Sequence, residues 1–85
     1  MQYLSSKKFD KQFVKLPKKI QEQFHEKLTL FKMDPFNPLL NNHCVHHPYE
    51  GCQSINITGD MRALFEISNN RALFIRVGSH SELYK

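Results

Sequence analysis

The residues best suited to chemistry in this 85-residue sequence gather at its C-terminal end. An apolar run over residues 74–77 leads into Gly78 and predicts that the tail ends as a strand, and behind the glycine come His80, Glu82 and Tyr84. These side chains can donate a hydrogen bond, accept one or stack, and an imidazole can also exchange a proton near neutral pH. Because the tails of small domains are usually frayed and chemically inert, this ending indicates that the C-terminus helps to build a site.

A second group of reactive side chains occupies the segment before the last third of the chain. Its members are His43, Cys44, His46, His47 and Cys52. Such donors could hold zinc, but their spacing matches no standard pairing of zinc ligands and a proline stiffens the middle. We therefore keep zinc as a weak alternative and expect no metal and no other cofactor. The two cysteines are expected to be free thiols, since no framework of several bridges is present.

Two helices are expected ahead of that segment, after a possible short strand over residues 1–5. Apolar residues at i, i+4 and i+7, namely Phe9, Phe13 and Leu16, predict a first helix. One of the serines at positions 5 and 6 is expected to cap it. Pro17 should end this helix and can begin the next. The second is predicted from about Pro17 to Met33, and the tight connection suggests an antiparallel helical hairpin. Its apolar stripe consists of Ile20, Phe24, Leu28 and Phe31.

The pattern changes to strand period after a loop-like stretch over residues 34–51. Three alternating runs follow, separated by the turn signals Thr58-Gly59-Asp60 and Ser68-Asn69-Asn70, and they predict an antiparallel meander. In the last run, the alternation places Leu73, Ile75 and Val77 on one face. Helices followed by strands indicate a single α+β domain over residues 1–85, with the N-terminal strand and helical hairpin packed on one face of the sheet. The other face, with Arg62, Glu66 and Arg76, should be partly open.

The charge distribution favours a polyanionic partner. The formal net charge is +4, and six lysines crowd residues 7–19. Such a field suits nucleic acid, an anionic membrane surface or an acidic protein. No run is long enough to cross a membrane and no signal peptide is visible at the start, so we expect a cytoplasmic protein.

Two segments carry a resemblance to a known family. Residues 51–66 contain Gly-Asp-x-Arg-Ala, beginning at Gly59, and residues 75–84 contain Gly-Ser-His-x-x-Leu-Tyr, beginning at Gly78. Together they resemble the RelE/ParE superfamily of type II toxins, most closely its YafQ-type mRNA interferase branch, and the likeness extends over nearly the whole chain. The resemblance implies a βααβββ fold and a metal-independent endoribonuclease that cleaves mRNA in the ribosomal A site. Its implied partners are a cognate antitoxin, in a hetero-oligomer, and the ribosome with its mRNA.

The resemblance also implies roles for individual residues. His80 matches the proton-donating histidine, and His43 matches a second histidine that acts as acid or base or holds the substrate. His46 or His47 could share that second role or be merely solvated. Asp60 would orient a catalytic histidine, Arg62 would bind the scissile phosphate, and Tyr84 would stack on a base or assist proton transfer. The remaining expected contacts to phosphate or RNA come from Arg76, Lys15, Lys18 and Lys19.

Some positions depart from the family pattern. Asn56 stands where the best-studied branch has a further histidine, Met61 stands where it has a tryptophan, and Cys52-Gln53 replaces an aromatic-arginine pair. Two other functions therefore stay open. One is a ParE-like toxin that inhibits DNA gyrase, although that class generally lacks the C-terminal histidine. The other is a catalytically weakened module that only binds an antitoxin.

Overall fold

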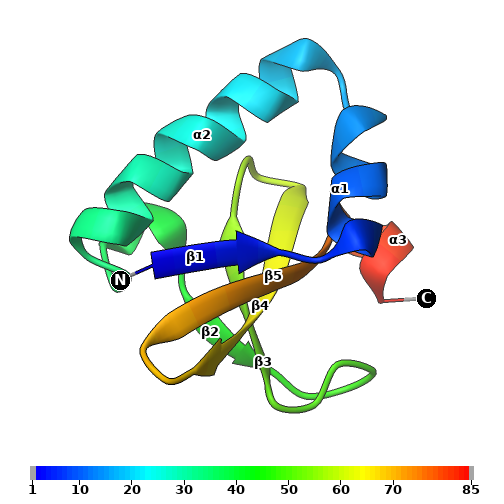
Figure 1. The fold of residues 1–85 in the computed structure, drawn as a ribbon. Coiled ribbons are helices and arrows are strands. Elements are labelled where there is room, and N and C mark those ends of the chain that lie inside the picture. The colour runs from blue at the N-terminus through cyan, green and yellow to red at the C-terminus, as the bar shows by residue number, and fades with distance from the viewer. Residues whose placement is uncertain (1, 85) are drawn as a thin grey trace.

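The computed structural model describes residues 2–84 of the chain and has an α+β fold (Figure 1). The elements in chain order are β1 (Gln2–Ser5), α1 (Lys7–Val14), α2 (Lys18–Met33), the 3-10 turn η1 (Pro38–Leu40), β2 (His43–Val45), β3 (Cys52–Asn56), β4 (Met61–Ser68), β5 (Arg71–Ser79) and α3 (His80–Leu83). The predicted order of a strand, two helices and then a sheet is confirmed.

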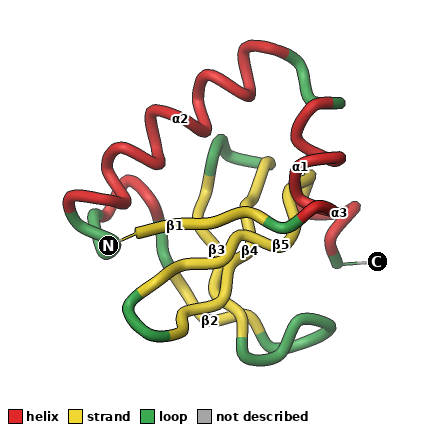
Figure 2. Tube along the Cα trace, in the orientation of Figure 1, coloured by secondary structure: helices red, strands yellow, loops and turns green. Residues whose placement is uncertain are grey.

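The sheet has the strand order β1-β5-β4-β3-β2 (Figure 2). The predicted meander is confirmed, because β3 pairs antiparallel with β4 and β4 pairs antiparallel with β5. The first strand joins the last one in parallel, with Leu4 opposite Leu73. The strand that leads into the C-terminal site is therefore held by neighbours on both sides.

Both long helices cover one face of this sheet, and they diverge from their short connection (Figure 1). The hydroxyl of Ser6 accepts a hydrogen bond from Phe9 N at 3.1 Å, which caps α1 as expected of a serine at this position. Pro17 is the N-cap of α2 and separates the two helices, as predicted from its position. The Gln21 amide donates to the carbonyls of Phe13 and Leu16, both at 3.1 Å, and fastens the end of the first helix to the start of the second.

Aromatic rings dominate the core between the helices and the sheet. Phe74 is fully buried at its centre, and four other phenylalanine rings lie within 6 Å of its centroid: Phe9 (5.8 Å), Phe24 (5.6 Å), Phe31 (5.7 Å) and Phe65 (5.2 Å). Edge-on and tilted contacts of this kind add to the hydrophobic gain of burying the rings. The predicted apolar stripes of both helices pack into this core.

A β-bulge in β5 changes the predicted alternation. Leu64 lies opposite Arg76 and Phe65 opposite Phe74, so Ile75 is the extra residue. Phe74 and Val77 consequently both pack toward the helices, whereas Ile75 packs on the other side of the sheet. The prediction that Leu73, Ile75 and Val77 share a face is wrong, because one inserted residue reverses the phase of a period-two pattern.

Two further segments differ from the sequence interpretation. Residues 34–51, predicted as loop, contain η1 and the three-residue strand β2, which adds an edge to the sheet. The tail does not end as a strand, because β5 passes into the single helical turn α3. A strand of three residues and a helix of four are too short to show a periodicity of their own.

Candidate functional site

The face of the sheet opposite the helices carries a second, smaller apolar cluster. Its buried members are Val45, Leu64 and Leu83, with Tyr49, Ile75 and Tyr84 packed against them. The expectation of a partly open face is thus met only in part, since α3 and the β2–β3 loop cover some of it. The uncovered remainder is where the reactive side chains collect.

The turn α3 is fixed against β5 by a complete capping box. The hydroxyl of Ser79 accepts from Glu82 N at 3.2 Å, and Oε1 of Glu82 accepts from Ser79 N at 2.8 Å. A Cβ atom at Gly78 would lie only 3.3 Å from that Glu82 oxygen and 3.7 Å from Leu83. Glycine therefore favours the close approach of α3, because a larger residue here would have to displace the Glu82 side chain by a few tenths of an ångström.

A cavity of about 400 Å³ lies beside α3, and we call it the histidine cavity. Residues from β2 and the loop after it, from β4 and from α3 line it, including His43, His46, His47, Arg62, His80 and Tyr84. All four histidines are exposed. The cavity therefore contains several imidazoles that can gain or lose a proton, and beside them a guanidinium that is permanently charged.

The ring of His43 has a defined hydrogen-bond partner. Its Nδ1 lies 2.7 Å from the carbonyl oxygen of Asn41, which has a left-handed backbone with φ of 49°. Because a carbonyl only accepts, Nδ1 carries the proton in this contact and Nε2 of the neutral ring is left as an acceptor. That tautomer suits a base that takes a proton at Nε2.

His80, the first residue of α3, pairs with Tyr84, the residue that caps the end of α3. Their ring centroids are 4.7 Å apart with the planes inclined by 46°, and Tyr84 also packs on the second cluster. The backbone of His80 is tied to the β3–β4 turn, because its N–H donates to the Asp60 carbonyl at 2.9 Å. The packed tyrosine and the bound backbone together position the exposed imidazole.

Arg62 is held at the same turn by its own side chain. One guanidinium nitrogen donates to the carbonyls of Thr58 and Gly59, at 3.1 and 2.8 Å. In the sheet Arg62 lies opposite Gly78, which carries no side chain, and opposite Asn56. These contacts hold the positively charged guanidinium of Arg62 against the wall of the histidine cavity, near the start of β4.

The structure does not bring every predicted residue into this cavity. Asp60 is exposed and reaches His80 through backbone atoms, and its carboxylate is not part of the lining. Arg76 and Lys15 line a separate hollow on the other side of α3. Lys18 and Lys19 are exposed at the start of α2 and line neither hollow.

Sequence reasoning left out Asn41 and gave His46 and His47 little weight, although all three line the cavity. The histidines belong to the lining because β2 places the whole segment at the edge of the site. A usable signal exists for Asn41, since asparagine is enriched among residues with positive φ. Its placement two residues before His43 is what brings the carbonyl to the ring.

Polar atoms are buried in the sheet next to the cavity. The Ser54 hydroxyl and Asn56 Oδ1 are inaccessible and have no hydrogen-bond partner among the described residues. The Cys52 thiol lies 3.9 Å from Glu66 Oε1. Its burial and the Glu66 carboxylate raise the pKa of Cys52, while Arg76 acts in the opposite direction. Both cysteines are free, as expected.

Met61 has a structural role. Met61, at the position of the family's tryptophan, packs on the helix-side core and does not line the cavity.

Within residues 2–84 no three or more His, Cys, Asp or Glu side chains are grouped so that they could hold a metal ion. In the same range, no helix combines the length and the apolar character that a membrane span requires.

Comparisons with known proteins identify the fold. Neither a protein-family model nor a curated protein sequence matches the chain. Among solved structures, YafQ from Escherichia coli strain BL21(DE3) matches with a TM-score of 0.79 at 19% identity, over 98% of this chain and 97% of that one. YafQ in the E. coli DinJ–YafQ toxin–antitoxin complex gives a TM-score of 0.78 at 19% identity, over 98% and 96%. A YoeB/ParE toxin from Agrobacterium tumefaciens gives 0.77 at 18% identity, over 94% and 99%. The chain therefore has the fold of these toxins along nearly its whole length.

Proposed function

We propose that this protein is the toxin of a type II toxin–antitoxin pair, of the YafQ-like branch of the RelE/ParE superfamily, and that it cleaves mRNA on the ribosome. The fold it shares with YafQ and the family-like segments around Asp60 and His80 support the assignment. The observation that carries the chemistry is the histidine cavity, in which separate parts of the chain contribute His43, Arg62, His80 and Tyr84.

The reaction we propose uses only these side chains. His43 takes the proton of a ribose 2′-hydroxyl at Nε2, and the oxygen attacks the adjacent phosphorus. Arg62 stabilises the negative charge that develops on the phosphorane oxygens. His80 gives a proton to the departing 5′-oxygen, so the products are a 2′,3′-cyclic phosphate and a 5′-hydroxyl. Tyr84 stacks on a neighbouring base.

Asp60 has a positioning role in this proposal. Its backbone carbonyl holds His80 N at 2.9 Å and thereby fixes the first residue of α3. The partner that restrains such a toxin is an antitoxin, as in the DinJ–YafQ complex. An acidic segment of that antitoxin would complement the lysines of α1 and of the start of α2, including Lys15, Lys18 and Lys19.

A translation assay with purified protein and mapping of mRNA 5′ ends tests the proposal. We expect new 5′ ends with the wild-type protein and a rate lower by about 10²- to 10⁴-fold with His80→Gln, since general acid catalysis contributes that much. His25→Gln is the matched control, because His25 is exposed on α2 and lies outside the cavity. Intact mRNA with the wild type, or equal cleavage by His80→Gln, would refute the ribonuclease. Inhibition of gyrase by the purified protein would identify the ParE-like function instead.

A further inference from the structure

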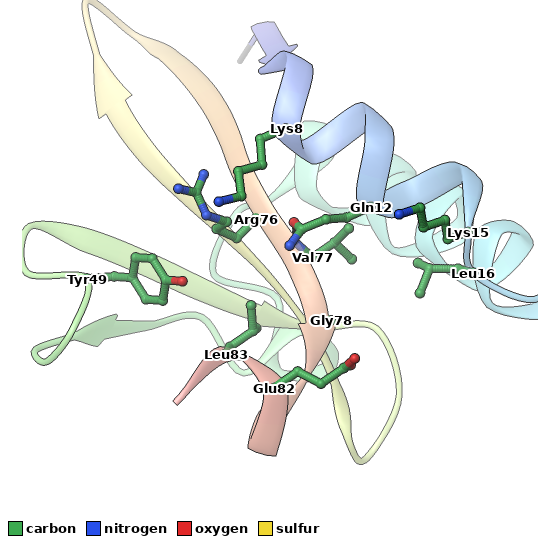
Figure 3. A pocket seen from close by; sticks show the side chains of 10 residues that line it. All are labelled: Lys8, Gln12, Lys15, Leu16, Tyr49, Arg76, Val77, Gly78, Glu82 and Leu83. Carbon is green, nitrogen blue, oxygen red and sulfur yellow. Dashed lines mark hydrogen bonds between the residues drawn. The ribbon is translucent and has the colours of Figure 1, made fainter. Parts of the chain in front are cut away.

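A second hollow of about 410 Å³ lies between α1, β5 and α3, and we call it the basic groove (Figure 3). The side chains that give it its character are Lys8, Gln12, Lys15, Tyr49, Arg76 and Glu82. In Figure 3 the α1 residues form one wall, Tyr49 lies on the opposite side, and α3 closes the bottom. Three cations against one carboxylate make the groove suitable for an anion.

The walls of the basic groove are fixed by contacts within the protein. Lys8, Gln12 and Lys15 share one side of α1 because they are four and three residues apart. The side-chain oxygen of Gln12 accepts from Val77 N at 3.0 Å, which fastens this side of α1 to β5. Arg76 donates to the Ile75 carbonyl at 2.8 Å. These contacts fix Gln12 and Arg76 at the groove, and Lys8 and Lys15 extend from α1 and its C-terminal end as exposed side chains.

The bottom of the groove and its aromatic side add two features. Glu82, the single acidic residue of the lining, accepts from Ser79 N through Oε1. The Arg76 guanidinium lies 5.8 Å from the centre of the Tyr49 ring. A cation beside an aromatic ring is an arrangement that also receives a stacked base and its phosphate.

The basic groove and the histidine cavity are neighbours across α3. At the end of α3, Leu83 lines the groove and the next residue, Tyr84, lines the cavity. In the β2–β3 loop, Tyr49 lines the groove and His47 lines the cavity. One extended chain could therefore enter both hollows. The position of the basic groove next to the histidine cavity, together with its three cations, favours as its occupant the same RNA strand that the proposed cleavage requires in the cavity.

We propose that the basic groove binds a second phosphate of the same single-stranded RNA whose scissile phosphate lies in the histidine cavity. Lys8, Lys15 and Arg76 neutralise that phosphate, and the attached base stacks on Tyr49. This inference rests on the proposed function, because it needs RNA in the cavity. It adds a subsite that lies one or more nucleotides from the cleaved bond.

Phosphate interference in short oligonucleotides tests the subsite. The probe is a set of 2′-O-methylated hexaribonucleotides, which cannot be cleaved, with one phosphate at a time replaced by a neutral methylphosphonate. Binding is measured at low salt, because phosphate contacts weaken as salt rises. For the wild type we expect two separate positions at which neutralisation lowers affinity about three- to tenfold.

The groove variant Lys8→Gln/Lys15→Gln should lose the sensitivity at one of these positions and keep it at the other. The control Lys7→Gln/Lys11→Gln removes the same charge from the same helix, but Lys7 and Lys11 do not line the groove, so both positions should remain sensitive. Tyr49→Leu should lower affinity about fivefold or more, since a stacked base contributes roughly 1–3 kcal/mol. The logarithmic salt slope should fall by about 0.7 for each phosphate contact that is lost.

Several results would overturn the subsite. They are a single sensitive phosphate in the wild type, equal effects of the groove and control variants, or no measurable binding of the oligonucleotides. Binding of a glutamate-rich peptide that depends on Lys8 and Lys15, without any change for RNA, would assign the groove to an acidic protein instead. The proposed cleavage is tested separately. If two phosphates are sensitive but no cleavage depends on His80, the RNA-binding subsite is supported and the ribonuclease function is refuted.

Discussion

The two faces of the sheet are built differently. The helix-covered face buries five phenylalanine rings, with Phe74 at their centre, together with aliphatic side chains. The opposite face has a cluster of only three buried residues, and next to it lie the unpartnered oxygens of Ser54 and Asn56. One face thus supplies most of the apolar burial, while the other carries groups that cost stability when buried.

The difference shows how a small chain combines a fold with a site. Net stabilities of small domains are only about 5–15 kcal/mol, so polar groups can be buried on one side only where the other side is well packed. The same strands serve both purposes, because alternate residues point to opposite faces. In β4, Ala63 and Phe65 belong to the core while Arg62 lines the histidine cavity.

The largest effect should come from the centre of the aromatic core. Phe74→Ala is expected to cost about 3–5 kcal/mol, because it removes a fully buried ring and leaves a cavity. Urea unfolding followed by circular dichroism measures the loss. The matched control is Phe36→Ala, whose ring is 72% exposed and which should change stability by less than about 0.5 kcal/mol. Equal effects of the two substitutions would contradict the assignment of the core.

A smaller effect is expected from the second cluster. Leu83→Ala should cost about 2–3 kcal/mol and should also slow the proposed mRNA cleavage, because Leu83 anchors the turn that carries His80 and Tyr84. Leu39→Ala, at a position that is 65% exposed, serves as the control for both measurements. Loss of stability with unchanged cleavage would show that α3 does not need this anchor to position the imidazole.

The smallest effect has the opposite sign. Ser54→Ala should leave stability unchanged or raise it by up to about 1 kcal/mol, because it removes a fully buried hydroxyl that has no hydrogen-bond partner. Ser6→Ala makes the same chemical change at the N-cap of α1 and should cost about 1 kcal/mol. A clear loss of stability at Ser54 in thermal unfolding would mean that its hydroxyl is satisfied and that the two faces differ less than proposed.

The parts of the fold that sequence analysis predicted well are those with a strong local signal. The stripes of both helices and the stop at Pro17 agree with the structure to within a few residues. The turns at Gly59 and Asn69 separate the strands of the meander as expected. Each of these features depends on side-chain spacing or on backbone conformations that few residues adopt.

The parts that were mispredicted depend on partners distant in sequence. The strand β2 forms only because β3 pairs with it, and the bulge at Ile75 is set by the register against β4. In the site, the alternation predicted Arg62 and Arg76 on the same partly open face of the sheet. The structure assigns Arg62 to the histidine cavity and Arg76 to the basic groove, and α3 separates the two.

The sequence by itself determined the helices, the meander and the two reactive segments around His43 and His80, because these features depend on residue type and local spacing. Only the tertiary structure decided that β1 pairs with β5, that a bulge turns Ile75 to the face opposite Val77, and that Arg62 and Arg76 line different hollows. The physical reason is that each of these contacts depends on how closely folded segments approach one another. Such distances follow from the packing of the whole core and from no single stretch of the chain.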